Sequence, residues 1–88
     1  MSSSSQVMYT LYDLKADFYS APFFAPNDQV AIRDFHKLVY VSNAIAPAYA
    51  SDFILYEVGS FNSDTGLFDS LSTIALVIEG SALKPDVS

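Results

Sequence analysis

The sequence predicts a small α+β domain: a mostly antiparallel sheet of four to five strands with one main helix packed on one face, in the order strand, strand, helix, strand, strand. Three observations predict it, namely one helix-period stripe, extended apolar runs on both sides of that stripe, and turn-forming residues between the last two runs. The 88 residues are 51% hydrophobic, which suffices for one core. We expect the domain to span residues 7–80, between a disordered Ser-rich tail at 1–6 and a flexible tail at 81–88.

Two extended segments precede the helix. Both alternating sets of residues 7–14 are largely apolar, which predicts a strand covered on both sides. Residues 18–24 form the second segment, and Pro22 places it at an edge because proline lacks a ladder donor. Consecutive residues of an extended chain point to opposite faces, so only one of Phe23 and Phe24 can enter the core beside the helix.

The helix is predicted over residues 28–42. Asn27 is a favourable N-cap residue, and Asp28 puts negative charge in the first turn, where the helix dipole favours it. The apolar stripe follows at helical spacing and consists of Ala31, Phe35, Leu38, Val39 and Ser42. Residues 43–51 contain Pro47 and small side chains, and we expect a loop there.

The last part of the chain predicts a hairpin. Residues 52–61 read as a strand, in which Gly59 marks a bulge. Residues 62–66 have the composition of a turn, and a return strand starts at Leu67. Residues 73–79 are a largely apolar run suited to a buried strand.

The composition excludes several kinds of site. Cysteine is absent and His36 is the only histidine, so we expect no metal site. The turn at 62–66 lacks the full run of oxygen ligands and the closing Glu of a calcium loop. No nucleophile elbow or Gly-rich phosphate loop is present, so we expect no catalytic residues, no cofactor and no enzymatic activity. No apolar run is long enough to cross a membrane and no export signal is visible, so we expect no membrane association.

The net charge of −6, from ten acidic and four basic residues, argues against nucleic-acid capture by the whole surface but leaves room for a local site. Arg33 and Lys37 stand at i and i+4 on the exposed helix face, with Tyr40 beside them. Such a strip suits contact with a phosphate backbone while the tyrosine stacks on a base, and Lys15 is a candidate addition. The same residues are also what any solvated helix shows to water.

Whichever of Phe23 and Phe24 does not enter the core must pack against something outside the core. An oligomer interface, a partner groove or a stacked base could each supply that contact. We favour the interface, because a small aromatic-rich domain often completes its core across a symmetric contact. The sequence therefore predicts a homodimer or higher oligomer, with Phe23, Phe24 and Tyr12 as the candidate interface residues.

Three segments in this order carry a resemblance to a known family: YTLYDLKADFYSAPFFAPND, then AIRDF on the helix, then SDFILYEVGSFNSDTGLF. Together they resemble the small nonstructural protein of the Microviridae, the tailless single-stranded DNA bacteriophages, and especially its gokushovirus branch. The similarity covers about residues 9–68, and the tail after Leu71 matches less well. The matching positions are Tyr12, Asp13, Lys15, Ala16, Tyr19, Pro22, Phe23, Ala25, Ala31, Arg33, Phe35, Asp52, Leu55, Tyr56, Gly59, Phe61 and Gly66.

The resemblance implies a non-enzymatic phage accessory protein that is absent from the mature particle. Members of the family are likened to the microviral protein that switches replication to single-stranded synthesis and couples it to packaging. The implied partners are the phage replication complex, the procapsid or single-stranded DNA, in the cytoplasm of the bacterial host. The alternative is a scaffold-like assembly factor whose acidic surface binds protein and does not bind nucleic acid.

Overall fold

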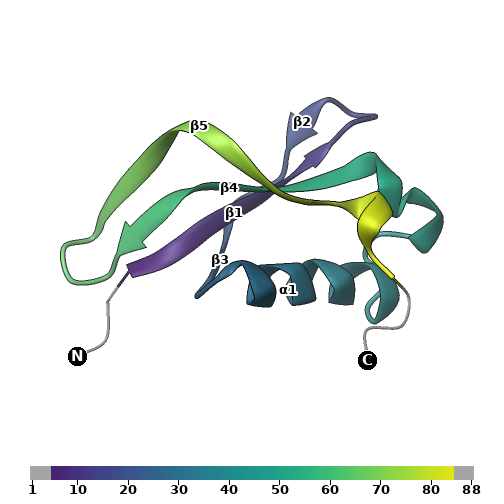
Figure 1. The fold of residues 1–88 in the computed structure, drawn as a ribbon, viewed down its shortest axis with the longest axis horizontal. Helices are drawn as coiled ribbons and strands as arrows, with labels where there is room; N and C mark the ends of the chain where they lie inside the picture. Colours follow the sequence, from purple (N-terminus) through teal and green to yellow (C-terminus); the bar gives the residue numbers. More distant parts are fainter. Residues whose placement is uncertain (1–4, 85–88) are drawn as a thin grey trace.

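The computed structural model describes residues 5–84 and confirms the predicted class: five antiparallel strands form one sheet, and one helix lies on one of its faces (Figure 1). The strand order is β2-β1-β4-β5, and β3 pairs with the other end of β1. Residues 1–4 and 85–88, which belong to the two expected tails, lie outside the described residues. The elements are β1 (Ser5–Asp13), β2 (Phe18–Tyr19), β3 (Phe23–Ala25), α1 (Asp28–Tyr40), the 3-10 helix η1 (Pro47–Asp52), β4 (Phe53–Asn62), β5 (Leu67–Glu79) and the 3-10 helix η2 (Gly80–Ala82).

Strand β1 is central, because β4 pairs with one side of it and β2 and β3 pair with the other. Buried side chains lie on both of its faces, but only the helix side is covered by another element of the described chain. Tyr9 and Leu11 belong to the core on the helix side, whereas Met8 and Thr10 are buried on the opposite face.

The single extended segment predicted at residues 18–24 is instead two short strands. The hydroxyl oxygen of Ser20 accepts a hydrogen bond from the backbone N–H of Leu11 at 3.1 Å, and the Ser20 carbonyl accepts one from the Thr10 hydroxyl at 2.8 Å. Ser20 also donates its backbone N–H to the Leu11 carbonyl at 2.8 Å, and between this residue and Phe23 the regular ladder with β1 is interrupted. The pairing resumes at Phe23.

Helix α1 begins where the sequence predicted. The side-chain oxygen of Asn27 accepts a hydrogen bond from the backbone N–H of Val30 at 3.0 Å. The helix ends at Tyr40, two residues earlier than expected, because Asn43 adopts a left-handed backbone with φ of 57° and turns the chain away. The predicted loop that follows contains η1.

The β4–β5 hairpin is confirmed, but the prediction of a buried strand at residues 73–79 is wrong: they belong to the edge strand β5 and most of them are exposed. The Asn62 side chain accepts hydrogen bonds from the backbone N–H groups of Asp64 and Thr65, and Gly66 supplies a φ of 76°. The expected bulge lies beside Gly59, where Val58 has no partner on β1. Strand β5 is continuous, but its residues 71–74 arch away from β4, so that four residues stand opposite Val58 alone (Figure 1).

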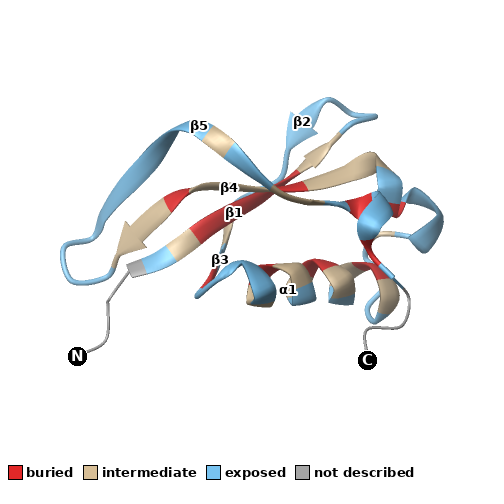
Figure 2. Ribbon diagram, in the orientation of Figure 1, coloured by how far each residue is buried: buried red, intermediate tan, exposed pale blue. Residues whose placement is uncertain are grey.

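The core lies between α1 and the facing side of the sheet, and it extends under the end of the chain (Figure 2). Leu83, in the segment expected to be a flexible tail, is only 8% exposed and belongs to this core. No element of the described chain covers the other face of the sheet (Figure 1). The fully buried large side chains are Tyr9, Phe35, Leu55 and Val39.

Candidate functional site

The outer face of α1 carries two exposed cations, as the helical stripe predicted. Ala31, Phe35 and Val39 point into the core, so Arg33 and Lys37 project into solvent from the opposite side of the helix. Within residues 5–84, neither cation makes a hydrogen bond or an ion pair. Among these described residues, neither side chain therefore has the acidic partner of an ordinary surface ion pair.

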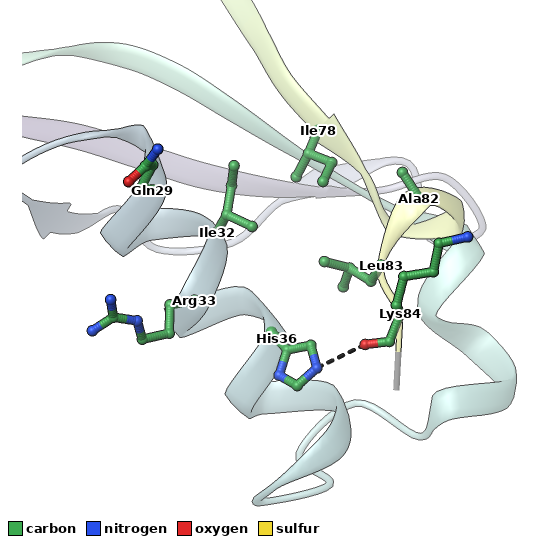
Figure 3. A pocket seen from close by; sticks show the side chains of 8 residues that line it. All are labelled: Gln29, Ile32, Arg33, His36, Ile78, Ala82, Leu83 and Lys84. Atoms are coloured by element: carbon green, nitrogen blue, oxygen red, sulfur yellow. Dashed lines mark hydrogen bonds between the residues drawn. The ribbon is translucent and has the colours of Figure 1, made fainter. Parts of the chain in front are cut away.

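A groove of about 380 Å³ runs between this helix face and the end of the chain after β5 (Figure 3). Its floor is apolar, with Ile32, Ile78 and Leu83, and no acidic residue of the described chain lines it. Arg33 and Lys84 stand on opposite rims and point away from each other (Figure 3). We call this the cationic groove; its lining residues are Gln29, Ile32, Arg33, His36, Ile78, Ala82, Leu83 and Lys84.

His36 fixes the shape of the groove. Its Nε2 atom lies 2.8 Å from the backbone oxygen of Lys84, and because a carbonyl can only accept, Nε2 carries the hydrogen. The imidazole also packs on the Tyr40 ring, with centroids 5.0 Å apart. His36 thus attaches the end of the described chain to the helix, and Tyr40 is half-buried with one ring face occupied.

Lys15 is not part of this groove. It lies in the turn between β1 and β2 and lines a separate depression together with Asp13 and Asp52. The backbone N–H of Lys15 donates to the Asp13 carboxylate at 3.0 Å, which holds the turn. Of the four residues predicted for DNA contact, the structure brings three to one helix face and places Lys15 elsewhere.

Sequence reasoning missed Lys84. It stands in a segment with proline and small residues that predicts a tail, and nothing local indicates that it approaches the helix. The apolar Leu83 beside it is the one signal that this segment packs on the domain.

The three residues predicted for an oligomer interface divide between the two faces of the sheet. Phe23 packs on Tyr9 on the helix side, with ring centroids 5.9 Å apart, whereas Phe24 is 42% exposed on the opposite face. Tyr12 shares that opposite face and packs on Tyr19. A hydrogen bond from the Tyr12 hydroxyl to Asp17 raises the pKa of Tyr12 to about 12.

The described part of the chain shows neither a metal-binding cluster nor a membrane-spanning helix. Among residues 5–84, no group of three His, Cys, Asp or Glu side chains could hold a metal ion. None of the helices in that range has the length and apolar character needed to cross a bilayer.

Comparison with known protein families identifies the family of this chain. The model of a family described as Phage ORF5 protein matches residues 6–83, which is nearly the whole described chain. No curated protein and no solved structure matches the sequence.

Proposed function

Because the chain belongs to the Phage ORF5 protein family, we propose that it is a non-enzymatic phage accessory protein acting in viral single-stranded DNA synthesis and genome packaging. The resemblance to gokushovirus nonstructural proteins supports the finer assignment within the Microviridae. In this proposal the protein works in the bacterial cytoplasm, alongside the replication complex or the procapsid, and contacts single-stranded DNA directly.

The gathering of cations at one groove carries the proposal. Two of the four Lys and Arg residues line the cationic groove, and Lys37 stands one turn further along the same helix. On a chain of net charge −6, a helix face with two cations and a third cation, Lys84, on the facing rim of the groove is the place where a polyanion meets least repulsion.

The arrangement suits a single strand better than a duplex. Cations on separate rims would contact successive phosphates, while the apolar floor would accept the face of an unpaired base. Tyr40 would border this path, and its contact with His36 would hold its ring in place.

The test is fluorescence anisotropy of a labelled single-stranded oligonucleotide at low salt. Arg33→Glu and Lys15→Glu each change one cation to an anion, so they alter the net charge equally and form a matched pair. We expect Arg33→Glu to lower the affinity at least tenfold and Lys15→Glu to lower it much less. Three phosphate contacts predict a slope of log affinity against log salt of about −2 for a single strand.

The double variant Arg33→Glu with Lys37→Glu sharpens this test, and we expect it to abolish binding. Equal binding by the double variant and the wild type would contradict the groove as the DNA site. Equal losses from Arg33→Glu and Lys15→Glu would show that only the overall charge matters.

A second candidate function is supported by the acidic balance of the chain and by its uncovered sheet face. In that case the protein is a scaffold-like assembly factor that binds another protein and binds no nucleic acid. Absence of any anisotropy change at low salt, with the protein folded, would favour this alternative.

A further inference from the structure

The face of the sheet opposite α1 is aromatic and apolar. One cluster joins Phe24, Phe61 and Phe68, with successive ring centroids 5.9 and 5.2 Å apart. Strand pairing places further apolar side chains beside this cluster, and Thr10, Tyr19, Pro22, Val58 and Ile74 surround a shallow depression there. We call this surface the open face; its residues are Met8, Thr10, Tyr12, Tyr19, Pro22, Phe24, Ile54, Tyr56, Val58, Phe61, Phe68, Ile74 and Leu76.

The open face exposes a large apolar area. Four of its large side chains, Tyr19, Phe24, Phe68 and Leu76, are 51%, 42%, 61% and 53% exposed. With about 200 Å² for each such side chain, these four alone leave roughly 400 Å² of apolar surface in water. The half-buried members of the face add to this, so the total approaches the approximately 800 Å² per partner of a stable protein interface.

Charge is confined to the ends of this face. Asp17, which accepts the hydrogen bond of the Tyr12 hydroxyl, lies at one end. Glu79, which pairs with Ile54, lies at the end of β5. Between them the open face carries no ionisable group other than tyrosine, although the chain has fourteen Asp, Glu, Lys and Arg residues.

This distribution disfavours nucleic acid as the occupant of the open face. Aromatic platforms that stack bases have Lys or Arg beside them to hold the phosphates. Here Arg33, Lys37 and Lys84 stand on the helix side, which is the other side of the sheet. The chemistry of the open face therefore fits a neutral apolar surface.

We propose that the open face binds the open face of a second copy of this chain. A face without central charge can meet itself across a twofold axis with no like-charge contact, although each chain carries −6. The two sheets then stack about 10 Å apart, as in a β-sandwich. Both helices remain outside, so each copy keeps its cationic groove accessible.

The test is the mass of the protein by sedimentation velocity across a range of concentrations. We expect the wild type to reach twice the chain mass of 9.6 kDa. Leu76→Glu places a charge within the proposed contact, beside Tyr56, and should give a monomer. Leu67→Glu is the matched control, because Leu67 is also exposed on β5 but alternates to the other face, and it should remain a dimer.

A second measurement covers the case in which Leu76→Glu fails to fold. The chain has no cysteine, so Leu76→Cys and Tyr19→Cys can each be joined to a second copy by a flexible bismaleimide. We expect covalent dimers from both, and few from Leu67→Cys.

Several results would overturn the proposal. A wild type that is monomeric at every soluble concentration would do so, as would a dimer that Leu67→Glu disrupts and Leu76→Glu does not. Loss of single-stranded DNA binding in Tyr19→Ala, with the wild type monomeric, would instead identify the open face as a base-stacking surface. None of these outcomes depends on the Arg33 test, so the two proposals can fail separately.

Discussion

At the scale of single residues, Tyr9 links the sheet to the start of the helix. Its side chain is fully buried in the central strand, and its hydroxyl donates to the Asp28 carboxylate at 2.7 Å. Burial, and then the hydrogen bond to Asp28, raise the pKa of Tyr9 well above the ordinary tyrosine value. The same carboxylate sits in the first turn of α1, where the helix dipole favours it.

Tyr9→Phe should lower the free energy of unfolding by about 1–2 kcal/mol at neutral pH, because the hydrogen bond to Asp28 is lost. The unfolded chain releases the Tyr9 proton near pH 10, whereas the folded chain holds it to higher pH. Wild-type stability should therefore fall as the pH rises above about 10, by up to about 1.4 kcal/mol per unit from this group. Urea denaturation from pH 8 to 11 should show a shallower decline for Tyr9→Phe, and equal slopes would contradict this assignment.

At the scale of elements, the two 3-10 helices close the end of the core. Gly80 begins η2 directly against η1, and a Cβ atom built on it would lie 1.7 Å from the backbone oxygen of Ala50. Only glycine allows the two backbones to approach this closely. The contact places the following residues, Leu83 in the core and Lys84 on the rim of the cationic groove.

Gly80→Ala should lower the free energy of unfolding by about 3 kcal/mol, because the clash is with backbone and no side chain can move aside. Displacement of η2 should also weaken DNA binding, since Lys84 would leave the groove. Ser81→Ala is the control, because Ser81 is exposed in the same element and should be nearly neutral. Urea denaturation of both variants checks this, and a Gly80→Ala protein as stable as wild type would show that η1 and η2 separate at little cost.

The elements that the sequence predicted well are those with local signals. Asn27 caps the helix it precedes, and the residues at 62–66 contain the whole chemistry of their turn. The split between β2 and β3 was missed because it depends on Ser20 bonding to Leu11 on another strand. At the candidate site, the stripe predicted that Arg33 would be exposed, but Lys84 is placed by His36, 48 residues away along the chain, which no local pattern encodes.

At the scale of the whole molecule, the two faces differ in how they should respond to salt. The helix side carries the cations of the proposed DNA site, whereas the open face is neutral between its ends. Added salt screens the attraction of cations for phosphate, and it also screens the repulsion between two chains of charge −6.

Raising the salt concentration should therefore weaken DNA binding and leave self-association unchanged or stronger. Anisotropy and sedimentation velocity on the same samples, from low to high sodium chloride, measure the two effects together. Dissociation of the dimer by salt would mean that ion pairs hold the dimer together. This result would contradict the open face as the contact surface.

The arch in β5 affects whether self-association stops at a dimer or continues to larger assemblies. Strand β5 is thirteen residues long and forms one edge of the sheet. An uninterrupted edge strand of that length can pair with edge strands of other copies, and repeated pairing of this kind builds a fibre. The arch at 71–74 divides its pairing with β4 into two separate ladders of four residue pairs each. Neither ladder offers a long, flat template, so assembly through stacked faces would stop at a closed pair instead of continuing into a filament.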